Sequence, residues 1–282
     1  SFRGKAMALN NMLMAKSLEL ILKLAEDVYA AEAAFRKASG ATREFSSDIG
    51  DSFDQVRGFG VTLEDTSKAT SSLYRNFTDF TFATKSARLD LVNTAGILSR
   101  LGVDSDSFAK GLQTQTKAFG MTGEAGAAAF LELTHYARET GQDVGVLSGQ
   151  YAAMAPKLAK LGSAGHKAFM DLARVQKITG LEMTKILNIT DKFDTFEGAA
   201  DQAGKLNAAL GGNFVNAMEL MMDTDPVSRF NQIRDAILNQ GLAFDDMSYY
   251  QRKFFTDSID GLETEADLAA LLSGNMDMLA SS

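Results

Sequence analysis

The stretch RGFGVT at residues 57–62 returns in altered form as KAFGMT at residues 117–122 and as KITGLE at residues 177–182. Each copy starts with a basic residue and contains a glycine followed by an apolar residue. A glycine just past a helix end adopts the left-handed conformation at little steric cost, and a basic residue in the last turn suits the negative end of the helix dipole. Thr62 and Asp65 resemble a capping box. Each copy therefore predicts a helix end, a turn and a helix start.

The same signals occur more often than every sixty residues, usually about 18–21 residues apart, which leaves room for four turns of helix and a short link. The predicted helix-cap and turn positions are Gly60, Thr62, Gly102, Gly120, Thr122, Gly141, Gly162, Gly180, Gly241 and Gly261. A structural repeat of sixty residues explains the even spacing of the three stretches. A chance match between capped helices of similar length also explains it.

The composition predicts an all-α fold. The chain has 282 residues, 45% of them apolar, and only two prolines, Pro156 and Pro226. Proline is the strongest helix breaker, whereas the plentiful Ala, Leu, Met, Lys and Glu favour helix. No segment has the alternating pattern of a strand. We expect a long N-terminal helix followed by an array of short capped helices arranged as helical hairpins.

These signals predict four segments along the chain. They are a long helix that forms an assembly bundle (1–40), a short helix and linker (41–61), a helical-hairpin domain (62–210) and a C-terminal helical region (211–282). The Gly211–Gly212 pair is the clearest flexible point. Asp225 and Pro226 predict a helix start in the last segment, with the Asp side chain as the cap.

The predicted N-terminal helix carries apolar residues on two faces. One stripe at 3–4 spacing is the candidate assembly interface, made of Met14, Leu18, Ile21, Leu22, Ala25, Val28 and Tyr29. A second stripe is made of Leu13, Leu20, Leu24 and Ala31. Apolar character on two faces is typical of a helix held between neighbours. Those neighbours are either other copies of the chain or the rest of its own core.

Composition excludes several classes of protein. The absence of cysteine excludes disulfides, thiolate metal sites and cysteine nucleophiles, and it fits a reducing compartment. A net charge of -8 argues against a dedicated nucleic-acid binder, since such proteins carry a basic surface. No apolar run is long enough for a spanning helix, and polar residues interrupt the N-terminus where a signal peptide is apolar. The chain begins at Ser1, which fits a piece of a longer protein or a trimmed product.

No catalytic, cofactor or metal site stands out. His135 shares a helix face with Glu139, but a metal site needs three or four ligands. His166 has no evident partner in the sequence. Glycosidases need only two carboxylates, and the candidates are Glu132, Glu139, Asp194 and Glu197. Their scatter among helix caps and polar faces favours side chains that are simply exposed to solvent. We predict no enzyme activity, no cofactor and no metal.

Two further clusters have simpler explanations than a binding site. One stretch of the chain is locally basic and contains Lys157, Lys160, Lys167, Arg174 and Lys177. It suits an acidic partner or nucleic acid, although a solvated helix face explains it too. Met218, Met221 and Met222 form a methionine patch of the kind that fills cores or assembly interfaces. Its charge pattern is not that of an interfacial membrane helix.

One long stretch resembles a known family. Residues 191–237, DKFDTFEGAADQAGKLNAALGGNFVNAMELMMDTDPVSRFNQIRDAI, resemble the helical part of tail tape measure proteins from contractile-tailed, T4-like phages of marine bacteria. FDDMSYYQRKFF at residues 244–255 continues the resemblance, and ARETGQDVG at residues 137–145 precedes it. The likeness covers roughly residues 95–275 and is one of wording and order, with no catalytic signature.

The resemblance implies a virion structural protein. Tape measure proteins lie in several copies inside the tail tube, set its length, dock to the baseplate hub and leave ahead of the DNA. It implies a homo-oligomer, trimer or hexamer, with tail tube and hub proteins as partners. It also implies a place in the virion, inside the tail tube, and in the host cytoplasm during assembly. We expect no specific nucleic-acid binding and no stable membrane insertion. The alternative is a soluble, solenoid-like helical adaptor from an unrelated system; a helical muramidase-like enzyme is a remote third.

Overall fold

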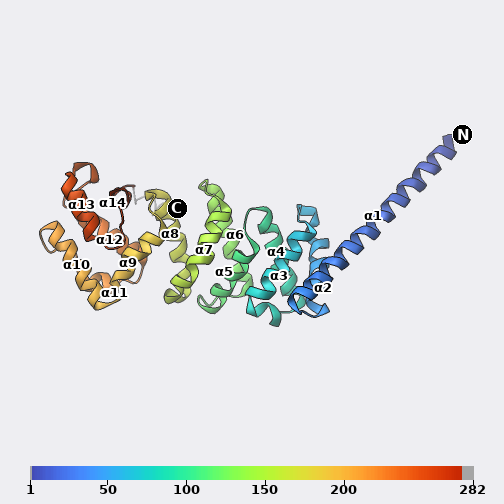
Figure 1. Cartoon of the computed structure of the whole chain (residues 1–282), viewed down its shortest axis with the longest axis horizontal. Coiled ribbons are helices and arrows are strands. Elements are labelled where there is room, and N and C mark those ends of the chain that lie inside the picture. The colour runs from blue at the N-terminus through green and yellow to red at the C-terminus, as the bar shows by residue number, and fades with distance from the viewer. Residues whose placement is uncertain (1, 275–282) are drawn as a thin grey trace. The chain divides into compact units, whose positions relative to one another are not determined.

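A computed structural model describes residues 2–274 of the chain, and their side chains from residue 12 onward (Figure 1). Within that range the named elements are all helices, and the only β pairing is an isolated bridge between Asp260 and Leu262. The predicted all-α class is therefore confirmed. None of the described helices is both long enough and apolar enough to cross a membrane.

The chain divides into two compact units, residues 1–156 (unit 1) and residues 157–282 (unit 2). The boundary lies in the last turn of α7 (Val144–Leu158) and therefore inside the range 62–210, which the sequence predicts as one helical-hairpin domain. Turn glycines occur in both units alike, so they do not reveal which helices share a core. The unit boundary depends on those packing contacts.

Unit 1 is built from helices that pack in series. Its elements are α1 (Phe2–Ser39), α2 (Arg43–Val56), η1 (Arg57–Phe59), α3 (Leu63–Asn76), η2 (Thr78–Phe82), α4 (Lys85–Arg100), α5 (Ser105–Lys117), α6 (Gly123–Glu139) and α7. Within α2–α6 each helix contacts the next one, and α2, α3 and α4 also contact the helix after that. Phe108, Phe130 and Tyr151 are fully buried and stack edge to face in its core. Contacts between near neighbours are typical of helical solenoids.

In unit 2 the helices do not pack simply in chain order. Its elements are η3 (Ala159–Ala164), α8 (Gly165–Thr179), α9 (Met183–Thr190), η4 (Asp191–Asp194), α10 (Phe196–Leu210), α11 (Ala217–Met222), α12 (Pro226–Leu238), η5 (Phe244–Asp246), α13 (Tyr249–Ser258) and α14 (Glu265–Leu272). The helix α8 packs on α9, α12 and α14. Buried Arg229 of α12 donates hydrogen bonds to the carbonyls of Thr190 and Leu220, which ties α9 and α11 to α12.

The eight glycines predicted at turns all have a positive φ, from 55° at Gly162 to 108° at Gly261. L-residues rarely adopt that conformation, so these positions favour glycine. Gly162 also has ψ of -129°, which takes it outside the left-handed helical region. The helices that follow Gly60, Gly120 and Gly180 begin at residues 63, 123 and 183, so helix starts keep the sixty-residue spacing of the sequence.

Side chains cap most of these helix starts. The Thr62 hydroxyl accepts the N–H of Asp65 at 3.1 Å, and the Asp65 carboxylate accepts the N–H of Thr62 at 2.8 Å. Thr122 caps α6 through its hydroxyl alone, which accepts the N–H of Ala125 at 3.1 Å. Glu182, the equivalent residue before α9, makes no side-chain cap. Asp225 caps α12 and Pro226 occupies its first turn.

Candidate functional site

The N-terminal part of α1 lies outside the core of unit 1 and exposes large apolar side chains. In Figure 1 this part of the helix extends away from α2 and α3. Met14, Ile21 and Tyr29 are each more than 60% exposed. The other exposed large apolar side chains on this stretch are Met12, Leu13, Leu18, Leu20 and Leu22. Monomeric soluble proteins rarely expose so many neighbouring apolar side chains, and patches of this kind mark interaction sites.

Apart from Met12, the large apolar side chains of this stretch occupy one side of the helix. At about 100° per residue, the charged side chains fall within an arc of about 100°. They are Lys16, Glu19, Lys23, Glu26 and Asp27. The opposite side, about 200° wide on the same geometry, is here called the apolar arc. Its apolar residues are Leu13, Met14, Leu18, Leu20, Ile21, Leu22, Leu24, Ala25 and Tyr29, and Ser17 and Val28 fall within the same range of angles. Met12 lies on the charged side.

The C-terminal part of α1 is anchored in unit 1. Phe35 is buried and belongs to a core cluster with Ile49 of α2, and Tyr74 of α3 stacks edge-on against its ring. Arg36 donates a hydrogen bond of 2.7 Å to the Ser46 hydroxyl of α2. Because one end of the helix is fixed in this way, the exposed end is held in position by a folded unit.

One residue of the predicted assembly interface contacts its own chain. A Cβ placed on Gly50 of α2 would lie 2.7 Å from a methyl carbon of Val28, so glycine is what lets the two helices approach there. Val28 is half-buried as a result, and we remove it from the predicted interface. Met14, Leu18, Ile21, Leu22, Ala25 and Tyr29 remain exposed. The second predicted stripe divides similarly, since Leu13 and Leu20 are exposed whereas Leu24 and Ala31 are half-buried.

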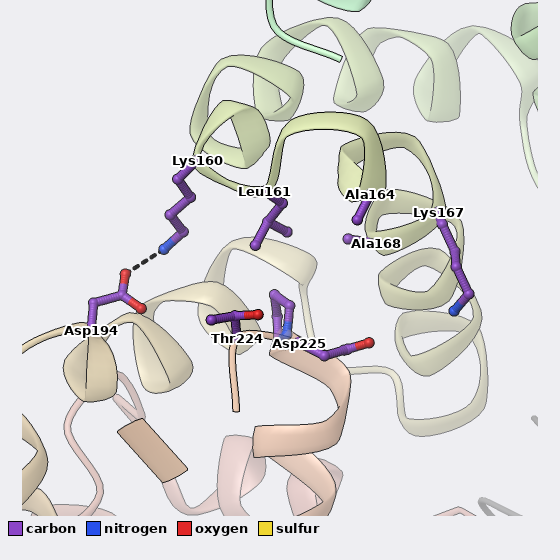
Figure 2. Close-up of a pocket in the computed structure, with 9 residues that line it drawn as sticks. Lys160, Leu161, Ala164, Lys167, Ala168, Asp194, Thr224 and Asp225 are labelled. Atoms are coloured by element: carbon purple, nitrogen blue, oxygen red, sulfur yellow. Dashed lines mark hydrogen bonds and ion pairs between the residues drawn. The ribbon is translucent and has the colours of Figure 1, made fainter. Parts of the chain in front are cut away.

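Unit 2 contains a pocket of about 420 Å³ between η3, α8 and the start of α12 (Figure 2). Lys160 donates hydrogen bonds to Asp194 at 2.5 Å and to Asp191 at 2.7 Å. Leu161 and Ala164 line the side that faces Thr224 and Asp225 in Figure 2. The Asp225 carboxylate accepts the N–H of Val227 at 2.8 Å, so it is used as a helix cap.

Lys160 and Asp194, which both line this pocket, neutralise each other. Burial opposes ionisation of Asp194, but hydrogen bonds from Lys160 and Arg229 outweigh it and lower the pKa of Asp194. Burial likewise opposes the charge on Lys160, but its hydrogen bonds to Asp191 and Asp194 raise the pKa of the amine. A carboxylate held ionised is a poor general acid, and an ammonium held protonated is a poor nucleophile.

The carboxylates predicted as candidates for acid–base chemistry do not form a site. Glu132 and Glu139 lie on α6 in unit 1, whereas Asp194 and Glu197 lie in unit 2. Glu139 lies 3.5 Å from exposed His135, as their spacing on the helix predicts. His166 lies in the first turn of α8. Among the described residues no group of three or more His, Cys, Asp or Glu side chains is placed to hold a metal ion.

The locally basic stretch of the sequence is partly neutralised by neighbouring carboxylates. Lys160 pairs with Asp191 and Asp194, and Lys167 and Arg174 both pair with Asp171. Sequence alone identifies the i,i+4 partner of Lys167, but the partners of Lys160 are more than thirty residues away. These contacts favour a solvated helix face over a patch that binds nucleic acid.

The methionine patch is a surface feature. Met218 and Met222 are 47% and 76% exposed, and only Leu220 of this short helix is buried. The patch therefore belongs to the outside of unit 2 and does not fill its core.

Comparison of the chain with models of protein families, with curated proteins and with solved structures finds no match.

Proposed function

We propose that this chain is a non-enzymatic structural protein that self-associates through the apolar arc of α1, and that it is a segment of a phage tail tape measure protein. The observation that carries the proposal is the exposed apolar arc on a helix whose other end is fixed in a folded unit. The resemblance of residues 191–237 to tape measure proteins supplies the biological setting.

The width of the apolar arc favours more than two copies. A helix in a two-stranded coiled coil buries a narrow seam, with charged residues usually flanking it. The arc on α1 is about 200° wide at 3.6 residues per turn, and Leu22 and Tyr29 occupy flanking positions. A helix with such an arc buries it fully only when it lies between two neighbours. Three or more copies satisfy this requirement.

The spacing within the arc also favours a trimer or a larger bundle. Met14, Leu18, Ile21 and Ala25 are separated by four, three and four residues, which is the spacing of a heptad seam. In that register Leu18 takes an a position and Ile21 a d position. Leu at a with Ile at d shifts coiled coils away from dimers towards higher oligomers. The charged side would then face outward, towards the wall of a tube.

An alternative function is supported by the serial packing of α2 to α6. Helical solenoids present extended surfaces to partners and need no self-association. A solenoid adaptor would use α1 to bind a different protein. The two functions predict different masses for the purified protein in solution, because only the first requires several copies to associate.

Tail length tests the tape measure assignment directly. In a phage whose tail contains this chain, two extra copies of residues 13–26 inserted after Glu26 add 28 residues and keep the heptad register. At 1.5 Å per helical residue, we expect tails longer by about 42 Å in electron micrographs. The same number of Gly and Ser residues inserted between Gly212 and Asn213, in a surface turn, should leave tail length unchanged. Tails of wild-type length from both insertions would contradict the assignment.

A further inference from the structure

The faces of α4 and α6 in unit 1 form a second, separate surface feature, an open groove of about 490 Å³. Along α4 it is lined by Ala87, Asp90, Leu91 and Thr94, which share one helix face. Along α6 it is lined by Glu124, Ala127, Ala128 and Leu131, which have the same spacing. Both faces extend over about two turns, or roughly 10 Å. Phe77 closes the floor and is itself buried.

The small side chains along both walls leave room for a third helix. Ala87 and Ala128 are exposed and project only a methyl group, so the backbone of another helix can approach closely. Leu131, 47% exposed at one end of the groove, offers an apolar contact to such a helix. Residues at i, i+3, i+4 and i+7 of a docked helix would fill the space that the two faces leave between them.

The charged residues that line the groove are all acidic. Asp79, Asp90 and Glu124 line it, and no lysine, arginine or histidine does. Lys117 pairs with Asp79. Asp90 and Glu124 are exposed and have no ion pair in the part of the chain that the structure describes. A helix that is complementary to this groove in charge therefore carries a basic residue on each side of its apolar stripe.

From the apolar floor, the small residues and the unpaired carboxylates, we infer that this groove binds a helix of a partner protein, with Ala and Leu along one stripe and Lys or Arg beside it. The apolar stripe of the partner helix lies against Phe77, Leu91 and the alanines of the groove. Its basic residues reach Asp90 on α4 and Glu124 on α6. This surface does not involve α1, so the inference is independent of the self-association proposed above.

A pair of synthetic peptides tests the inference on the full chain. Both are 18-residue helices with one Ala/Leu stripe, and they differ only in carrying Lys or Glu beside it. By fluorescence anisotropy we expect the Lys peptide to bind at least tenfold more tightly than the Glu peptide. Asp90→Lys/Glu124→Lys should reverse that preference. Both positions are exposed, and an unchanged circular dichroism spectrum checks that the fold is kept.

A substitution that fills the groove distinguishes docking in the groove from general attraction of a basic peptide to an acidic protein. Ala128→Trp leaves the net charge unchanged and should weaken binding of the Lys peptide at least tenfold. Ala125→Trp, on an exposed part of α6 outside the groove, is the matched control and should bind as the wild type does. Equal binding of the two peptides, or binding insensitive to Ala128→Trp, would overturn the inference. A change in the oligomeric mass caused by Asp90→Lys/Glu124→Lys would also overturn it, because the helix in the groove would then belong to a second copy of the chain.

Discussion

The guanidinium of Arg88 is almost wholly removed from water, with 2% of its side chain exposed. Its Nε donates to Asp48 at 2.6 Å, and Nη1 donates to Glu44 at 3.0 Å and to the carbonyl of Ala83 at 3.1 Å. The ring of Phe45 lies 4.8 Å below it. Asp48 is equally buried, and burial raises the pKa of its carboxyl despite the hydrogen bond from Arg88. This pair joins α2 to α4.

Removing only one partner of this pair should be costly. Arg88→Met leaves Asp48 buried without a cation, and we expect a loss of about 3–5 kcal/mol in the free energy of unfolding. Asp48→Leu/Arg88→Met should recover most of that loss, since an apolar pair of similar volume needs no desolvation of charge. Urea unfolding followed by circular dichroism measures both. A double variant no more stable than Arg88→Met would show that the two charges are not coupled.

Asp194 makes the stability of unit 2 depend on pH. Its pKa in the folded chain is lowered from 3.8 by Lys160 and Arg229, against the effect of burial. A lowered carboxyl pKa contributes stability above the unfolded value, and that contribution is lost as pH falls through the folded pKa. Asp194→Asn should therefore cost about 1 kcal/mol at neutral pH, a figure kept small because Asp194 is partly exposed to solvent.

The destabilisation caused by Asp194→Asn should shrink as pH falls below 3.8. Unfolding in urea at a series of pH values measures the difference from the wild type. A difference that stays constant down to the lowest pH would rule out this source of pH dependence.

At the scale of the element, the contact between α1 and α2 depends on one glycine. Because a Cβ at Gly50 would meet Val28 at 2.7 Å, Gly50→Ala must move the β-branched Val28 or the helix that carries it. We expect a loss of about 1–3 kcal/mol, as for other overpacked contacts. Thermal unfolding is the measurement.

Gly204 of α10 provides the matched control for that substitution. It also lies inside a helix, but a Cβ there would meet nothing within 4 Å. Gly204→Ala should stabilise the chain by about 0.5–1 kcal/mol, because alanine is favoured over glycine in a helix interior. If both substitutions shifted the melting temperature in the same direction, the close contact at Gly50 would not be the cause.

Helix ends could be predicted from the sequence, whereas helix partners could not. Gly60 with Thr62, and Asp225 with Pro226, act over a few residues, so their effect is visible in a short stretch. The pairing of Arg88 with Asp48 and that of Lys160 with Asp194 join residues more than thirty positions apart. The two apolar stripes of α1 were visible in the sequence. Which residues face the chain's own core depends on where α2 packs, as Val28 against Gly50 shows.

At the scale of the whole molecule, one end of α1 contributes to the core of unit 1 and the other presents the apolar arc. Exposure of the arc in a single chain costs free energy, at about 25 cal/mol for each Å² of apolar surface left in water. Association of several copies removes that cost. Self-association through α1 therefore requires that the isolated chain assembles.

Light scattering after size-exclusion chromatography, over a range of concentrations, measures this directly. We predict a discrete species of three or more copies of the 30.3 kDa chain. Leu18→Asp/Ile21→Asp, within the arc, should convert it to a monomer. Lys16→Gln/Lys23→Gln changes the net charge by the same amount on the charged side and should leave the assembly intact. A wild-type monomer at every concentration, or an oligomer that survives Leu18→Asp/Ile21→Asp, would contradict self-association through α1.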